Sequence, residues 1–172
     1  MADKRIEPGK YGYMIQYANG KDGNLEHDLG HYVQVLDCDQ FPSANFYTAH
    51  WTAAENHYQD ADVGHPPHEH KEFELIFLIG TDPEHPFDLG AKLDFSLGKE
   101  MEHHTLDKTC CLCMPGGLIH GSFIPREVNR PYILFRIHQA QHMSEYPHQE
   151  LLPEEIRAKI THPELWQPVN WD

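Results

Sequence analysis

Short strand-like runs separated by turn signals make up most of this sequence, and they limit what the chain can fold into. The runs are rich in β-branched and aromatic residues, which favour a pleated, half-buried backbone. Turn formers such as Asn19-Gly20 and Pro115-Gly116-Gly117 separate them. Many strands at close spacing, with hardly any helix between them, predict an all-β antiparallel sandwich or barrel. The expected strands are 11–17, 31–37, 46–52, 73–79, 92–97, 109–114, 118–124 and 132–138.

The C-terminal segment has a different pattern. Pro153 is followed by two glutamates, and Arg157 and Lys159 come later, which predicts a short helix over 153–160. We therefore expect a barrel over residues 1–142, including N-terminal strands, and a C-terminal extension over 143–172. The extension carries apolar residues, which should pack on the barrel or on a second subunit. These residues are Leu151, Leu152, Leu165, Trp166 and Trp171.

Length and charge exclude several classes of protein. A chain of 172 residues is long enough for one domain with its own core. A net charge of −14 argues against a nucleic-acid partner, because binding phosphates needs a basic surface. The longest apolar run, 75–79, is far shorter than the ~18 residues of a membrane helix. The first residues contain no apolar stretch typical of a signal peptide, so we expect a cytoplasmic protein.

The chain has four cysteines, and three of them lie close together. Cys110, Cys111 and Cys113 are too close in sequence for the disulfide framework of a secreted protein. They lack the Cys-x-x-Cys spacing of a thiolate metal site. Alternation along a strand would put Cys111 and Cys113 on one face and Cys110 on the other. The run is therefore interpreted as buried strand cysteines.

Histidine is unusually frequent, with 15 residues, and several of them cluster with glutamate. His68 and His70 are two residues apart, so on an extended strand both imidazoles face the same side. Glu74 has the same parity, and His120 follows a turn about forty residues later. Imidazole and carboxylate ligands together suit iron, manganese, nickel, copper or zinc. The alternative is that these histidines lie on the surface of a metal-free barrel.

These residues fall into two motifs that resemble those of the cupin family. The first cupin motif has His-x-His, then three or four residues and Glu; here His68, His70 and Glu74 match it, and Gly80 follows one residue early. The second motif has Pro-x-Gly-x-x-His, matched by residues 115–120, although Thr109 and Ile124 replace its outer Gly and Asn. The resemblance implies a jelly-roll β-barrel that holds one divalent transition metal inside. It also implies the ligand set His68, His70, Glu74 and His120.

Other polar residues are weaker candidates for a catalytic role. Alternation places Tyr132 and Arg136 on one strand face, and His50 shares a face with Thr48. An inward Arg or Tyr would bind a carboxylate or phenol-like substrate, whereas an outward one would belong to a polar surface stripe. His104, or its neighbour His103, is a candidate base beside the metal.

The resemblance implies metal-dependent chemistry on a small molecule. Iron(II) is the first choice of metal, with manganese, nickel, zinc or copper as alternatives. The favoured function is a dioxygenase that acts on a small organic acid or on a phenolic or diketone substrate. A lyase, decarboxylase or isomerase of the same fold, or a small-ligand-binding protein without turnover, remains open. Because cupin barrels commonly pair, we also expect a homodimer.

Overall fold

A computed structural model describes residues 11, 14–15, 17, 26–27, 30–52, 64–160, 163 and 166–172. Its strands are β1 (Glu26–His27), β2 (Gly30–Leu36), β3 (Phe46–Thr52), β4 (His68–Glu69), β5 (Glu74–Gly80), β6 (Asp88–Leu97), β7 (Glu102–Lys108), β8 (Cys110–Met114), β9 (His120–Val128), β10 (Tyr132–His138) and β11 (Tyr146–Pro147). A 3-10 helix, η2 (Gln149–Leu151), and one α-helix, α1 (Glu154–Arg157), follow them. The expected all-β class with a short helical extension is confirmed. Within the described residues, no helix has the length and apolar character needed to span a bilayer.

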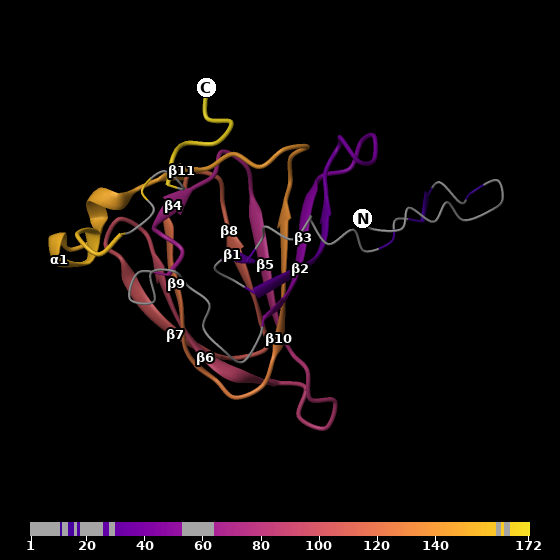
Figure 1. Ribbon diagram of the computed structural model, residues 1–172, viewed down its shortest axis with the longest axis horizontal. Coiled ribbons are helices and arrows are strands. Elements are labelled where there is room, and N and C mark those ends of the chain that lie inside the picture. The colour runs from indigo at the N-terminus through magenta and orange to yellow at the C-terminus, as the bar shows by residue number, and fades with distance from the viewer. Residues whose placement is uncertain are drawn as a thin grey trace.

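The strands form two antiparallel sheets that face each other as a jelly-roll barrel. One sheet has the order β1-β2-β3-β10-β5-β8, and the other has the order β11-β4-β9-β6-β7. The sheets approach each other where β6 and β10 meet, and they spread apart at the opposite end, near β4 and β11 (Figure 1). The strand ends that carry the histidines lie at this wider end.

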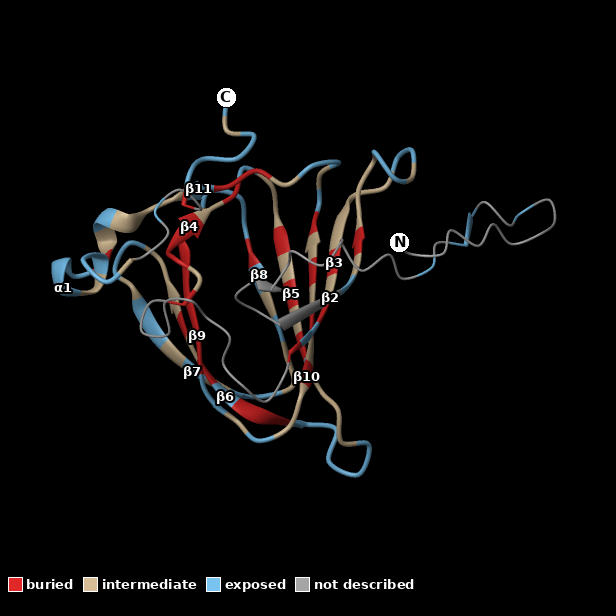
Figure 2. Cartoon of the chain, viewed as in Figure 1, coloured by how far each residue is buried: buried red, intermediate tan, exposed pale blue. Residues whose placement is uncertain are grey.

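Alternation of side chains explains why the sheets pack. In β10 every second residue from Tyr132 to His138 is buried, and in β3 the buried residues are Thr48, His50 and Thr52. Buried residues run along β3, β5, β9 and β10 and fill the space between the sheets (Figure 2). The core consists of Ile76, Leu78, Leu89, Ala91, Leu93, Phe95, Met114, Phe123, Tyr132 and Leu134.

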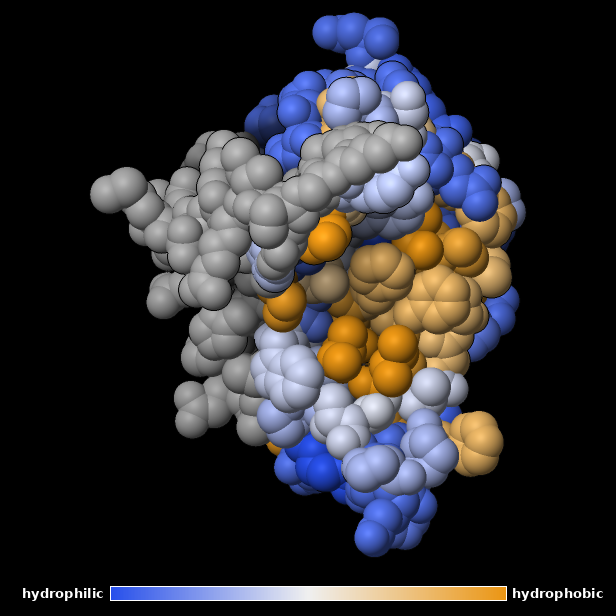
Figure 3. Space-filling view, turned by 90° about the vertical axis from the view of Figure 1, so that its right-hand side faces the viewer, coloured by the Kyte–Doolittle hydropathy of each residue, from blue (hydrophilic) through white to orange (hydrophobic). Residues whose placement is uncertain are grey.

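The opposite face of the six-stranded sheet is also apolar. Val33, Trp51 and Ile79 are each 40% exposed or more. Figure 3, which looks at the side of the molecule where β2 and β3 lie, shows apolar side chains gathered there. Cys111 and Cys113 are exposed on β8, the outermost strand of this sheet, so the prediction that both are buried is wrong. One face of β8 covers the core, and the opposite face, which carries Cys111 and Cys113, is exposed to solvent.

The C-terminal segment packs on its own barrel. β11 pairs with β4, and the Lys71 ammonium lies 5.2 Å from the centre of the Trp171 ring. Leu152 and Trp166 are buried together, with Ile156 and Ile160 packed against them. The expected helix is shorter than its sequence signals suggest, because α1 covers only 154–157 and turns follow it. Leu165 lies outside the described residues.

Other differences from the sequence prediction are local. In the expected strand at 11–17, the described residues Tyr11 and Met14 form a turn, in which the Met14 N–H donates to the Tyr11 carbonyl (3.0 Å). Strand β7 was not expected at all. The remaining expected strands are present, with ends shifted by a few residues.

Candidate metal centre

The pairing of the strands brings the two motifs together. His68 on β4 lies opposite His120 on β9, and Glu74 on β5 lies opposite His138 on β10. The first pair belongs to one sheet and the second pair to the other, so the four side chains meet between the sheets. His70 follows β4 directly and completes the group.

The four ligands implied by the motifs form one buried cluster. His68, His70, Glu74 and His120 are all 4% exposed or less, and each contributes a donor atom within 4.8 Å of the others. Glu74 Oε2 lies 3.0 Å from His120 Nε2 and 3.3 Å from His70 Nε2. The barrel thus gathers a carboxylate and three imidazoles at one point, as the resemblance implies.

Hydrogen bonds fix which ring nitrogens face the centre of the cluster. His68 Nδ1 lies 2.7 Å from the Pro66 carbonyl, and His120 Nδ1 lies 2.8 Å from the Leu118 carbonyl. His70 Nδ1 bonds to the Ser144 carbonyl. A carbonyl only accepts, so each Nδ1 carries a proton and donates it. In the neutral ring this leaves the Nε2 lone pair as an acceptor, which is the state that binds a metal.

The inward atoms then form a group of acceptors that lacks a donor. His70 Nε2, His120 Nε2 and Glu74 Oε2 are buried, and none has a hydrogen-bond partner among the described residues. Buried acceptors a few ångströms apart repel each other and are costly unless a cation lies between them. Three imidazole nitrogens and one carboxylate oxygen form a donor set that suits a divalent transition metal. The residues present therefore fit such an ion.

Electrostatics favours the charge states that a metal needs. Burial and the neighbouring His120 lower the pKa of His68 well below its usual range, which keeps that imidazole neutral. Burial alone would raise the pKa of Glu74. The imidazoles His120, His138 and His70 outweigh burial when they carry a proton at the nitrogen that faces Glu74, and they then hold the pKa of Glu74 well below its usual range. The carboxylate is thus ionised while His68 is neutral.

A second layer of residues supports Glu74 and His70, and the sequence did not single it out. His138 lies between two carboxylates, with Nε2 3.2 Å from Glu74 Oε1 and Nδ1 3.1 Å from Glu72 Oε1. Ser144 donates to Glu72 through its backbone N–H (2.9 Å) and its hydroxyl (2.6 Å). Burial would raise the pKa of Glu72, but its hydrogen bonds with His138 and Ser144 lower that pKa to about 2. Such partners orient metal ligands.

His65 and Glu145 form another pair beside the cluster. His65 Nε2 lies 3.6 Å from Glu145 Oε2, and the His65 ring packs edge-on against His68. Glu145 is 8% exposed. Burial would raise the pKa of Glu145, but the neighbouring His68 and His65 lower it. No short motif spacing marks this pair, because it joins the segment before β4 to the C-terminal segment.

A small cavity adjoins the cluster and contains one of the predicted catalytic candidates. Its wall includes the ligands His68, Glu74 and His120, and Arg136 lies in the wall with them. The rest of the wall is formed by Gly121, His65 and the apolar residues Ile76, Phe95, Phe123 and Leu134. The water-accessible volume is ≈ 20 Å³, little more than the ~10–15 Å³ that one water molecule needs. The space as it stands holds about one water molecule, so a larger ligand would enter only with movement of side chains in the wall.

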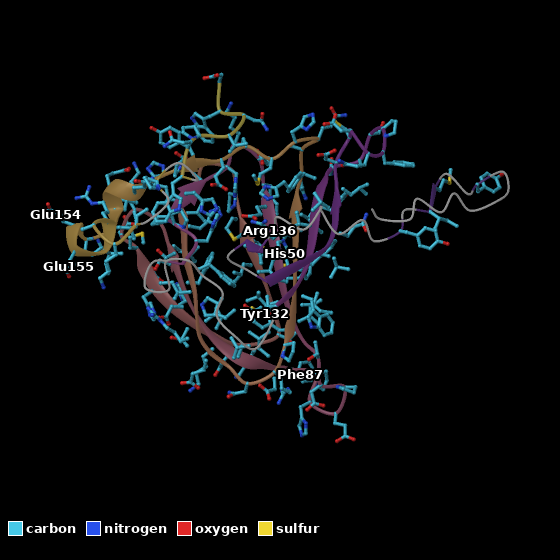
Figure 4. All side chains as sticks on the ribbon, viewed as in Figure 1. His50, Phe87, Tyr132, Arg136, Glu154 and Glu155 are labelled. Atoms are coloured by element: carbon cyan, nitrogen blue, oxygen red, sulfur yellow. The ribbon has the colours of Figure 1, made fainter. Side chains whose placement is uncertain are left out.

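The other candidates lie away from this cavity wall. Arg136, His50 and Tyr132 follow one another along the paired strands β3 and β10, and Tyr132 is the farthest from the wide end (Figure 4). His50 is buried next to Thr48, with its Nε2 3.0 Å from the Thr48 hydroxyl. Burial raises the pKa of Tyr132, which lies in the core. Of the three, only Arg136 lines the cavity.

His104 and His103 are not brought to the cluster. Their side chains are 41% and 58% exposed on β7, at the edge of the second sheet. His104 pairs with Glu102 (3.0 Å), and His103 pairs with Asp94 (3.0 Å). The hypothesis that one of them acts as a base beside the metal is not supported by these positions.

The Pro115–Gly117 turn between β8 and β9 is in direct contact with the backbone of the first motif. The Gly117 N–H donates to the His70 carbonyl (2.7 Å), and a Cβ added to Gly116 would lie 2.2 Å from the Lys71 carbonyl oxygen. Only a residue without a Cβ permits this approach. The turn thereby sets the position of His120 relative to His70.

Replacing Gly116 by Ala should therefore push the two motifs apart. We expect a loss of about 1–3 kcal/mol in the free energy of unfolding, as is typical of overpacking, together with weaker metal binding. Urea unfolding and metal titration measure the two effects. The exposed Lys99→Ala variant in the β6–β7 turn is the control. Unchanged stability and affinity in Gly116→Ala would show that the turn does not brace the site.

No protein-family model matches the sequence, and the comparison with curated proteins found no match. Among solved structures, an oxalate oxidase is similar, with a TM-score of 0.46 and 17% sequence identity. The similarity covers 76% of this chain and 62% of that chain, which is less than two thirds of its length. The two antiparallel sheets, and the meeting of both motifs in one buried group of three histidines and a glutamate, agree with the cupin-like arrangement that the motifs imply.

Proposed function

We propose that this protein is a metal-dependent dioxygenase that acts on a small organic acid. The observation that carries the proposal is a small cavity whose wall includes Arg136 and three of the four residues of the His₃Glu cluster. Iron(II) is the metal that we propose, because it would supply open coordination positions for substrate and dioxygen and the electrons that reduce oxygen.

Arg136 would bind the carboxylate of the substrate. Its side chain is buried on β10, and its Nε donates to the Thr48 hydroxyl (3.1 Å), which fixes the direction of the guanidinium. A guanidinium pairs with a carboxylate through two parallel hydrogen bonds, and this pairing is strong where water is excluded. Arg136 would therefore hold one end of the substrate while the other end faces the cluster.

The apolar walls of the cavity limit the size of the ligand and leave little room for water. Ile76, Phe95, Phe123 and Leu134 surround the space between the cluster and Arg136. Apolar walls strengthen the electrostatic attraction between a bound carboxylate and the guanidinium. Since the space is small, short carboxylic acids fit it better than the phenolic or diketone substrates that the resemblance also allows.

The test is oxygen uptake by protein that has been reconstituted with ferrous iron under anaerobic conditions. Short mono- and dicarboxylates, phenols and β-diketones are compared as substrates, and products are identified with and without oxygen. We expect oxygen-dependent turnover of a short acid. Arg136→Met should raise KM about 10- to 100-fold, since hydrogen bonds to charged groups contribute about 1.5–3 kcal/mol. Arg126→Met, which removes an exposed guanidinium paired with Asp94, is the matched control.

Each other outcome points to a different function. Turnover of the acid without oxygen would replace the dioxygenase with a lyase, decarboxylase or isomerase. Tight binding of an acid without turnover, with any of the candidate metals, would make the protein a ligand-binding cupin. An equal KM for Arg136→Met and the wild type would show that Arg136 does not bind the substrate.

A further inference from the structure

A second group of metal-binding side chains lies outside the central cavity. Cys38 and Asp39 are in the turn between β2 and β3, and His142 is in the segment that follows β10. Their donor atoms all lie within 4.8 Å of one another, and Cys38 Sγ is 3.2 Å from His142 Nε2. We propose that these three residues bind a second metal ion, of the zinc type, at a site that shares no ligand with the central cluster.

The chemistry of the three donors favours zinc. Thiolate, imidazole and carboxylate are its usual protein ligands, at about 2.3 Å for sulfur and about 2.0–2.2 Å for nitrogen and oxygen. In a tetrahedral site these bond lengths place sulfur and nitrogen about 3.6 Å apart. The observed 3.2 Å between Cys38 Sγ and His142 Nε2 needs an adjustment of only a few tenths of an ångström.

The backbone holds both sides of the group in place. In the turn, the Phe41 N–H donates to the Asp37 carbonyl (3.1 Å), and the Asp39 N–H donates to Asp37 Oδ1 (2.8 Å). On the other side, the Phe46 N–H donates to the Ala140 carbonyl (2.8 Å), two residues before His142. Since β2, β3 and β10 are neighbours in one sheet, the three donors are positioned before any ion binds.

The group is open to solution and distinct from the other cysteines. Asp39 and His142 are exposed and Cys38 is half-buried, so an ion can enter and keep water as its fourth ligand. Cys38 is a free thiol. Of the potential metal-binding groups among the described residues, this one alone contains sulfur. The net charge of −14 also attracts cations to the chain.

An ion at this position would also restrain the central site. His142 lies two residues before Ser144, whose carbonyl accepts the Nδ1 hydrogen bond of His70. The same Ser144 donates twice to Glu72. Binding at Cys38, Asp39 and His142 would therefore connect the β2–β3 turn to the segment that holds a ligand of the first metal.

Cobalt(II) tests the proposal, because a thiolate ligand gives it a sulfur-to-metal charge-transfer band in the near ultraviolet. The central cluster has no sulfur donor, so the band reports only the second site. We expect the wild-type protein to bind two cobalt ions per chain and to show the band. Cys38→Ser should bind one ion without the band, whereas His70→Ala should bind one ion and keep it. His142→Ala should weaken zinc at this site at least about tenfold, since one of its three protein ligands is lost.

Matched controls separate this site from its alternatives. Cys111→Ser and Cys113→Ser remove exposed thiols of β8 and should leave both the band and the stoichiometry unchanged. Circular dichroism shows that each variant is folded. Cobalt bound without a charge-transfer band in the wild type, or a band that survives in Cys38→Ser, overturns the proposal. One ion per chain with the band would instead show that the second site exists and that the central cluster does not bind cobalt.

Discussion

Replacing His70 by Ala is expected to remove the metal from the central cluster while the barrel stays folded. His70 contributes one of three imidazoles, and its Nε2 is a buried acceptor 3.3 Å from Glu74 Oε2. Loss of a residue that only orients a ligand typically lowers metal affinity about 10- to 100-fold, so loss of the ligand itself should exceed 100-fold. Metal content is measured by elemental analysis after purification without a metal-chelate resin. The 15 histidines of the chain would otherwise take up metal ions from the resin.

Two further variants are expected to lower metal affinity less than His70→Ala, or not at all. His138→Ala leaves all four ligands in place but removes the imidazole that lies between Glu74 and Glu72, so affinity should fall about 10- to 100-fold. His103→Ala removes an exposed imidazole on β7 and should change nothing. An unchanged metal content in His70→Ala would mean that His70 is not a ligand. Circular dichroism of the β-sheet should be retained in all three.

The ligand set was predictable because it lies in two short motifs with fixed spacings. His68, His70 and Glu74 lie within seven residues, and His120 follows a Pro-x-Gly turn with a fixed spacing. The strands β3 and β10 were also predicted at their observed ends. Both alternate between an inner and an outer face, and this period of two is readable without any tertiary information.

The supporting residues were not predictable, because their contacts join distant parts of the chain. Glu72 meets His138 and Ser144 across 66 and 72 residues. Nothing in the sequence near Ser144 marks its carbonyl as the partner of His70. Alternation does place His138 on the same face as Arg136, and this was the one available signal.

Strand β7 and the exposed cysteines were missed for a common reason, which is their position at the edges of the sheets. β7 is polar apart from Leu106, and it is a strand because its backbone pairs with β6. Its residues have no strand-like pattern to detect. On β8, alternation was read correctly, but residue type alone did not show that the face with Cys111 and Cys113 is the outer one.

The expected homodimer stays a prediction. The apolar residues Leu152 and Trp166 of the C-terminal extension do not support it, because they are buried within their own chain. The outer face of the six-stranded sheet does expose apolar side chains, at Val33, Trp51 and Ile79. Two acidic chains repel each other, and this repulsion is weakest where uncharged residues of the two chains meet.

Substitution at one of two adjacent residues of β5 is expected to cause the largest loss of stability, and substitution at the other is its control. Leu78 is fully buried and lies opposite Leu134 in the core, whereas Ile79 is 40% exposed on the outer face. Leu78→Ala should lower the free energy of unfolding by about 2–5 kcal/mol, through lost burial and the cavity that remains. Ile79→Ala should cost less than about 1 kcal/mol, because the site is open to solvent.

Urea unfolding in excess chelator measures both variants without a contribution from bound metal, which would otherwise stabilise the folded state. The difference between the two positions tests which face of β5 covers the core. A small loss at Leu78 would contradict the packing of the two sheets described here. Equal, large losses at both positions would instead show that the outer face is buried in solution. Light scattering of the same samples would then show whether a second copy of the chain covers it, because dissociation of a dimer makes unfolding depend on protein concentration.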